Sequence, residues 1–264
     1  MNSLLVKGKS HQTSIVKVTP ESAAWKYVGF EALKLKKNER YSLKTQEREF
    51  CVVLLSGFAD VITQTQAFNN IGERTSVFDA ASAYSVYVPY QDSIEIVANS
   101  DIEIALCSAP GGGNFETRLI SPQDIDYQLR GESTNTRHIY NILPENHPAH
   151  SLLVVEVKTP AGNWSSYPPH KHDSDNIPTE SYLEETYYHR LNPEQGFAFQ
   201  RVYTDSRDID ETMAVENHDV VMVPRGYHPV GAPHGYDLYY LNVMAGPSRA
   251  WHFNNDKDHE WIMK

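Results

Sequence analysis

Short apolar runs recur along the whole chain, and turn residues separate them at short intervals. The clearest runs are rich in β-branched side chains, which is typical of buried strands; they lie at residues 49–55, 85–88, 93–97, 102–106, 151–157 and 219–223. Helical periodicity is scarce, and the best helix start is at residues 121–129, where Ser121 would be the N-cap and Pro122 the first helical residue. Many short strands with few helices predict an all-β protein built as a sandwich or barrel.

A weak internal repeat runs through the chain. Val-Tyr-Val-Pro at residues 86–89 recurs as Val-Met-Val-Pro at residues 221–224, an offset of 135 residues (221 − 86). Such a repeat suggests a duplicated β domain, although an echo this short also arises by chance. Gly111–Gly113 falls between the two copies and is typical of a linker. We therefore expect an N-terminal domain at residues 1–120 and a C-terminal domain at residues 121–264.

Composition and charge narrow the classes of function. With 264 residues, 40% of them hydrophobic and 22% charged, the chain can bury one large β core or two ordinary ones. The net charge is −11, and the Lys and Arg residues are scattered rather than gathered in a stripe, so we do not expect a nucleic-acid partner. An acidic surface still allows an anionic substrate, because a few local cations can set the field inside a pocket.

Several features point to the cytoplasm. No apolar run is long enough to cross a bilayer, and the residues after Met1 lack the apolar core of a signal peptide. The two cysteines, Cys51 and Cys107, lie inside apolar runs and are expected to be small buried hydrophobes in a reducing compartment.

The most informative motif is His170-Lys171-His172, which follows two prolines. On a strand, residues i and i+2 point to one face, so both imidazoles would aim at a shared point. The prolines mark a strand start, which places the pair near the mouth of a barrel. An isolated His-x-His is more often a pair of surface histidines, so further ligands are needed to favour a metal.

Two later segments supply such ligands. Residues 184–191 form a strand-like run with carboxylates, and His228 follows a turn at the end of an apolar strand. The first half has no equivalent, because Ser93 aligns with His228 and no His-x-His occurs before Leu55. The pattern predicts one divalent metal, held only in the second copy, since two neutral imidazoles and a carboxylate suit such an ion.

These residues carry a resemblance to the cupins, which bind a metal through three histidines and a glutamate inside a small β-barrel. Residues 164–173, 184–189, 196–203 and 223–237 more specifically resemble the 5-deoxy-glucuronate isomerase family of bacterial myo-inositol breakdown, which is related to the uronate ketol-isomerase of the pectin pathway. The resemblance implies a double cupin, with two β-barrel or jelly-roll domains of which the first lacks metal ligands. It also implies a cytoplasmic, homo-oligomeric isomerase with a small uronate substrate and the ligands His170, His172, a glutamate and His228.

The glutamate is the ambiguous ligand. Glu185 lies 13 residues after His172 (185 − 172), further than is usual in cupins, and the intervening polar segment reads as a loop insertion. Glu180, Glu184 and Glu185 are all candidates. We choose Glu185, because strand alternation then places Tyr187 and His189 inside with it and turns Glu184 and Tyr188 outward.

An aldose–ketose isomerisation moves a proton between neighbouring carbons through an enediol. The implied metal would be a Lewis acid, zinc or manganese. His189 is our first candidate for the base, with Tyr187 beside it; the alternative is that both merely line the barrel. Arg201 and Arg225 are candidates to bind the substrate carboxylate, although most arginines are surface residues.

Two other functions compete with the isomerase. A metal-dependent dioxygenase could use the same ligands to hold ferrous iron. A sugar-binding cupin could hold a purely structural metal, in which case the metal would have no open coordination position.

Overall fold

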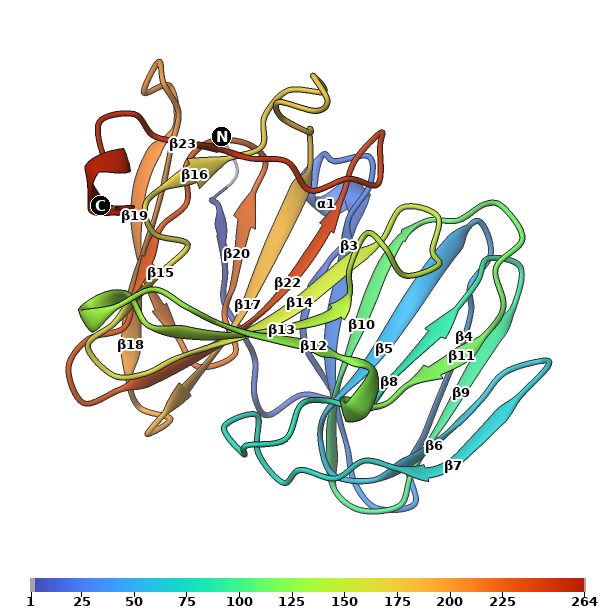
Figure 1. The fold of residues 1–264 in the computed structure, drawn as a ribbon. Coiled ribbons are helices and arrows are strands. Elements are labelled where there is room, and N and C mark those ends of the chain that lie inside the picture. Colours follow the sequence, from blue (N-terminus) through green and yellow to red (C-terminus); the bar gives the residue numbers. More distant parts are fainter. Residues whose placement is uncertain (1–2, 264) are drawn as a thin grey trace.

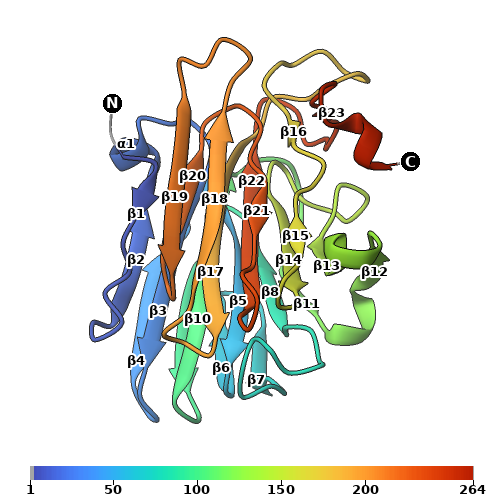
Figure 2. The same cartoon turned by 90° about the vertical axis from the view of Figure 1, so that its left-hand side faces the viewer.

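The computed structural model describes residues 3–263, which form two halves lying side by side (Figures 1 and 2). The strands numbered within the first half are β2 (Ser14–Val18), β3 (Gly29–Leu35), β4 (Arg40–Lys44), β5 (Arg48–Ser56), β6 (Ala59–Ile62), β7 (Ala67–Ile71), β8 (Ser85–Val88), β9 (Ser93–Ala98), β10 (Ile102–Pro110) and β11 (Arg118–Ile120). They form a six-stranded sheet in the order β11-β8-β5-β10-β3-β2 and a four-stranded sheet in the order β4-β9-β6-β7.

The second half repeats this plan. Its strands are β1 (Leu5–Val6), β12 (Asp126–Arg130), β13 (Arg137–Leu143), β14 (Leu153–Thr159), β15 (Trp164–Ser165), β17 (Glu184–Asn192), β18 (Phe197–Tyr203), β19 (Asp210–Glu216), β20 (Val220–Val223), β21 (Val230–Gly231) and β22 (Asp237–Ala245). A seven-stranded sheet in the order β1-β20-β17-β22-β14-β13-β12 faces a four-stranded sheet in the order β15-β21-β18-β19. A small ribbon pairs β16 (His170–Lys171) with β23 (Asn254–Asn255).

Helical structure is sparse: the helix α1 (Pro20–Ala23) and the 3-10 turns η1 (Pro122–Asp124), η2 (Ser133–Asn135) and η3 (Glu260–Met263). None of the helices within residues 3–263 is long and apolar enough to span a membrane. The helix predicted from Ser121 is wrong beyond its first turn. The Asp124 carboxylate does accept a hydrogen bond from the Ser121 backbone N–H, as in a capping box, but the chain then extends into β12, which pairs with β13.

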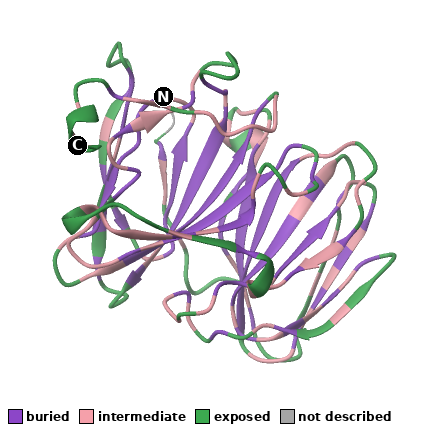
Figure 3. Ribbon diagram, in the orientation of Figure 1, coloured by how far each residue is buried: buried purple, intermediate pink, exposed green. Residues whose placement is uncertain are grey.

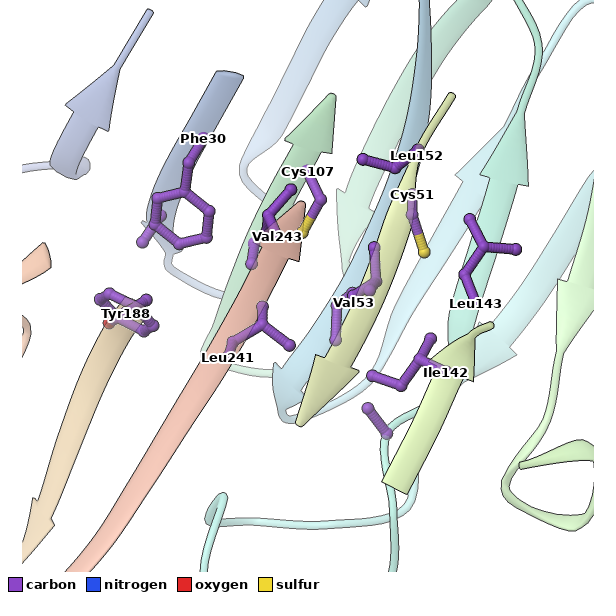
Figure 4. Close-up of a cluster of buried hydrophobic side chains, with 14 of the residues drawn as sticks. Phe30, Cys51, Val53, Cys107, Ile142, Leu143, Leu152, Tyr188, Leu241 and Val243 are labelled. Carbon is purple, nitrogen blue, oxygen red and sulfur yellow. The ribbon is translucent and has the colours of Figure 1, made fainter. Parts of the chain in front are cut away.

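Three apolar cores explain why the strands read as continuous apolar runs. One core fills each half, and a third lies between the two large sheets, so the central strands are buried on both faces (Figure 3). In β5, Val52 and Leu54 point into the first half, whereas Cys51 and Val53 join the core between the halves. In that core Phe30 packs on Tyr188 of the second half, with ring centroids 5.3 Å apart (Figure 4).

Two buried carboxylates also join the halves. Glu49, at the start of β5, accepts hydrogen bonds from the backbone N–H groups of His150, Ser151 and Leu152, just before β14. Glu184, at the start of β17, accepts three from the backbone of residues 26–28, just before β3. The two glutamates are 135 residues apart (184 − 49), the offset of the sequence repeat. Each half therefore binds the backbone of the other half through a glutamate at an equivalent position.

The expected division at residues 1–120 and 121–264 stays a prediction. The strand β11 ends at Ile120 in the first half, and β12 begins at Asp126 in the second. The strand β1, however, comes from the beginning of the chain and pairs with β20 of the second half.

Candidate metal centre

Three short segments bring the histidines to one end of the second half. His170 begins β16 directly after the two prolines, and His172 follows that strand. His228 lies in the loop between β20 and β21. The turn before it needs Gly226, whose φ is +96° and whose Cβ would lie 2.6 Å from the Tyr203 carbonyl oxygen.

His172, Glu185 and His228 converge on a common point. The Nε2 atom of His172 lies 3.1 Å from Glu185 Oε2, and the Nε2 atom of His228 lies 3.2 Å from the same oxygen. All three side chains are buried, and their ligand atoms lie within 4.8 Å of one another. Glu185 is thus the glutamate that the structure brings to the histidines.

Hydrogen bonds fix which ring nitrogen faces the centre. His172 Nδ1 donates to the Leu183 carbonyl oxygen at 3.0 Å, and His228 Nδ1 donates to the Gly226 carbonyl oxygen at 2.8 Å. In a neutral imidazole the Nε2 lone pair must then point at Glu185. Asn242 donates to the other carboxylate oxygen, Oε1, at 2.6 Å.

Acceptors that face one another need a cation between them. His228 Nε2 has no hydrogen-bond partner although it is buried, and an orphaned buried polar atom is costly. Two imidazole nitrogens and a carboxylate oxygen are the donor set of a borderline divalent metal. The residues present therefore fit a metal ion.

Burial keeps most of these histidines neutral, the form that binds a metal. It lowers the pKa of both His170 and His228 to about 3. His172 differs, because burial is outweighed there by its hydrogen bond with Glu185 and the negative charge of that residue, which together raise its pKa.

His170 lies beside this group rather than within it. Its ring centroid is 4.8 Å from that of His228, in an edge-on arrangement, and 6.5 Å from that of His172. Phe253, from the C-terminal segment, packs against its other side at 4.6 Å.

A cavity of about 670 Å³ opens beside the centre, and Glu185 and His170 both line it. That volume is within the usual range for a small-molecule site. The wall includes Tyr187 from β17 and Tyr240 and Asn242 from β22, together with residues of β12, β13 and the C-terminal segment.

The expected alternation along β17 is present. Tyr187 lines the cavity, and its hydroxyl lies 2.9 Å from Ser166 Oγ. Burial, with the nearby Glu185 charge, raises the pKa of Tyr187 well above 10. The outward residues Glu184 and Tyr188 do not reach solvent, because that face packs on the first half.

His189 is buried behind Tyr187 and does not line the cavity. The two rings stack with centroids 6.0 Å apart, and His189 Nε2 donates to Gln200 Oε1 at 2.9 Å. Burial lowers the pKa of His189 to about 4. The Tyr187 ring therefore separates His189, the predicted base, from any ligand in the cavity.

The structure does not bring Arg201 and Arg225 to the cavity. Both are partly exposed, and each is paired with an aspartate, Arg201 with Asp210 and Arg225 with Asp208. Two other arginines, Arg130 and Arg137, line the cavity instead. The sequence did not reveal them, because residues 121–129 were interpreted as a helix start and the strand pair β12–β13 was not predicted.

The fold defines a double cupin. Oxalate decarboxylase from Lactobacillus farciminis, solved as a formate complex, has a TM-score of 0.67 at 12% identity, covering 97% of this chain and 89% of that one. At that identity the likeness concerns the fold alone. The expectation of an all-β double cupin is confirmed, although each half is a pair of facing sheets rather than a closed barrel within residues 3–263.

The chain belongs to the KduI/IolB family, whose profile matches residues 4–262. The 5-deoxy-glucuronate isomerase of Geobacillus kaustophilus is 55% identical, covering 100% of this chain and 96% of its own length. That of Bacillus subtilis strain 168 is 51% identical over 100% of both. A solved IolB-like protein from Salmonella typhimurium LT2 has a TM-score of 0.98 at 51% identity, covering 99% of this chain and 100% of that one. The resemblance seen in the motifs is confirmed.

Proposed function

We propose that this protein is an aldose–ketose isomerase that converts 5-deoxy-D-glucuronate to 5-dehydro-2-deoxy-D-gluconate in myo-inositol catabolism. The full-length relatives named 5-deoxy-glucuronate isomerase, at 51–55% identity, support the substrate and the reaction. The observation that carries the proposal within this chain is the convergence of His172, Glu185 and His228 beside a cavity of small-molecule size.

We further propose that His170, His172, Glu185 and His228 hold one divalent ion, zinc or manganese. When bound, such an ion would act as a Lewis acid on the substrate carbonyl without changing its redox state. The chain prepares the site by orienting His172 and His228 through backbone carbonyls, which reduces the rearrangement that binding requires.

Tyr187 is the proposed proton-handling residue at the cavity wall. Its raised pKa keeps the hydroxyl protonated, so it can donate to a substrate oxygen, while Ser166 Oγ lies within hydrogen-bond distance of the same hydroxyl. His189 would act as a positioning residue, because it supports the Tyr187 ring from behind and is itself held by Gln200.

A cytoplasmic location is proposed from the cysteines. Cys51 and Cys107 are opposite each other on β5 and β10 and are both free, which suits a reducing compartment. Assembly into a homo-oligomer stays a prediction from the family resemblance, and light scattering would test it.

The test is an assay of the purified protein on 5-deoxy-glucuronate before and after chelation. Isomerisation should disappear with the metal and return when zinc or manganese is added back. Full activity in protein that elemental analysis shows to be metal-free would contradict the metal-dependent mechanism. Oxygen uptake without isomerisation would instead favour a dioxygenase.

A further inference from the structure

Two arginines face each other on the wall of the cavity. The strands β12 and β13 are antiparallel, and Arg130 is directly opposite Arg137 in their register. Both residues line the same cavity as Glu185 and His170. Like charges in directly opposite positions destabilise a strand pair, so this arrangement needs a compensating group.

Within residues 3–263, neither arginine forms an ion pair. Arg137 Nη1 donates to the Asn135 carbonyl oxygen at 3.0 Å, and Arg130 donates to the Gln128 side-chain oxygen through Nε at 3.0 Å and Nη2 at 2.6 Å. The buried Arg74, in contrast, is neutralised by Glu156 at 2.9 Å. The guanidinium groups of Arg130 and Arg137 therefore remain free to bind an anion.

The positive charge is also partly shielded from water. Burial lowers the pKa of Arg137, and the charge of Arg130 opposite lowers it further. Arg137 is half-buried whereas Arg130 is exposed, so an anion at Arg137 would be screened less by solvent.

We propose that Arg137, assisted by Arg130, binds the substrate's carboxylate and makes the cavity selective for sugar acids over neutral sugars. This inference rests on the proposed isomerase function. A uronate carries its carbonyl and its carboxylate at opposite ends of one short chain. A single cavity lined by the proposed metal ligands and by two unpaired guanidiniums offers a partner to each end, and a guanidinium fork matches a carboxylate in bidentate fashion.

The test compares two inert competitors that differ in one functional group, D-gluconate and D-glucitol. Their inhibition constants are measured with the metal-loaded wild type and with the variants Arg137→Gln and Arg137→Lys, at fixed ionic strength. Arg137→Gln should weaken gluconate binding roughly 10- to 100-fold, the range expected for lost hydrogen bonds to a charged group, and leave glucitol binding unchanged. Arg137→Lys should retain part of the preference, because it keeps the charge but loses the fork.

Arg40→Gln is the matched control, because Arg40 is an exposed arginine paired with Glu95 in the first half. It should leave both competitors unaffected. Metal content, measured for every variant, should stay at the wild-type level. For the substrate, Arg137→Gln should raise KM far more than it lowers kcat, as expected for a contact remote from the reacting carbons.

The outcomes separate this inference from the proposed function. If the protein isomerises 5-deoxy-glucuronate but Arg137→Gln keeps its preference for gluconate, the carboxylate site is refuted and the isomerase stands. Equal losses for both competitors would refute it too, since they would indicate a structural role. If Arg137→Gln does not fold, Arg137→Lys replaces it in the test. A smaller preference for gluconate over glucitol in Arg137→Lys than in the wild type would then support the site, and an unchanged preference would refute it. The wild type could also prove to have no isomerase activity while Arg137→Gln still abolishes the preference for gluconate. That result would support the carboxylate site and refute the proposed function.

Discussion

At the residue scale, Glu185 is the side chain on which the proposed metal centre depends. One of its oxygens faces the Nε2 atoms of His172 and His228, and the other is held by Asn242. Asn242 therefore fixes the carboxylate so that the first oxygen stays aimed at the histidines. Without a cation this geometry is favourable only if an imidazole is protonated, which agrees with the raised pKa of His172.

Replacing His172, Glu185 or His228 with Ala should strip the metal, because each change removes a donor from a small buried site. Elemental analysis of the purified variants is the measurement. His170→Ala is expected to do likewise, although His170 lies at the side of the other three.

Glu184→Gln is the control for these variants. Glu184 is the neighbouring carboxylate, but it points to the other face of β17 and bonds to the backbone of the first half. Its metal content should stay near normal. A metal-free Glu184→Gln beside a metal-loaded Glu185→Ala would contradict the assignment of the ligand.

Tyr187→Phe should lose turnover by about 100- to 10,000-fold, the usual contribution of a positioned proton-transfer group. Metal and fold should be retained, because only one hydroxyl is removed. His189→Gln should lose less, since His189 does not reach the cavity.

Steady-state kinetics with metal analysis would measure these losses, and the reaction in deuterated water would test the enediol route. Solvent deuterium should appear at the carbon that gains hydrogen. A larger loss in His189→Gln than in Tyr187→Phe would return the catalytic role to the histidine.

The buried imidazole of His218 should make the free energy of unfolding depend on pH. Its Nδ1 donates to the Tyr188 hydroxyl at 2.7 Å, Lys34 lies 3.4 Å from Nε2, and Glu103 and Arg190 lie close by. Burial, with the charges of Arg190 and Lys34, outweighs Glu103 and lowers the pKa of His218 to about 4.

Because that pKa is below the value of about 6.5 in the unfolded chain, the unfolded state binds more protons between these values. Lowering the pH from 7 to 5 should therefore cost wild type about 2 kcal/mol more than His218→Gln. Urea unfolding at the two pH values measures the difference. An equal loss in both proteins would show that His218 is not the group responsible.

At the element scale, the strands were predictable where their side chains serve simple packing. The runs at residues 49–55 and 102–106 lie in β5 and β10, and the alternation along residues 184–191 correctly separated Glu185 from Glu184. The site histidines were also visible, because short motifs carry them. The sequence could not predict what each strand face contacts. The residues of β17 that point away from the cavity pack on a sheet of the first half and are not exposed to water.

The segment at residues 121–129 shows the opposite case. Its start has a capping-box hydrogen bond from the Ser121 backbone N–H to the Asp124 carboxylate, and local rules therefore favoured a helix. Pairing with β13 overrides that preference over residues 126–130. Arg130 and Arg137 lie beyond that segment and could not be found from the sequence, because their position depends on the register of two strands and not on any motif. Arg201 and Arg225 looked suitable by sequence but face aspartates on the surface.

At the scale of the whole molecule, the two halves share a buried core, and we therefore expect them to unfold as one cooperative unit. A core that includes Phe30, Tyr87, Tyr188 and Tyr239 lies between the large sheets, and β1 crosses from the start of the chain into the second half. The sequence repeat predicted the duplication. It could not predict that the copies pack back to back, because their shared core uses the same kinds of apolar residue as each half's own interior.

The reciprocal glutamates make this cooperativity testable. Glu49 is fully buried and accepts hydrogen bonds from three backbone N–H groups at 2.6–2.8 Å and from the Tyr87 hydroxyl at 2.6 Å. Glu49→Ala would leave these donors unsatisfied, and each buried unsatisfied group costs roughly 1–3 kcal/mol. The variant should therefore lose about 3 kcal/mol or more of its free energy of unfolding.

Glu49→Gln keeps one acceptor oxygen and should lose less. Urea denaturation followed by tryptophan fluorescence and by circular dichroism measures both variants. If the halves are one cooperative unit, the two signals should still coincide, and the midpoint should fall with little change in slope. The first half holds the glutamate and the second half holds the donors at residues 150–152, so its loss weakens both together. Separate transitions in wild type would contradict a single cooperative unit. An unchanged midpoint in Glu49→Ala would show that the Glu49 carboxylate does not stabilise the contact between the halves.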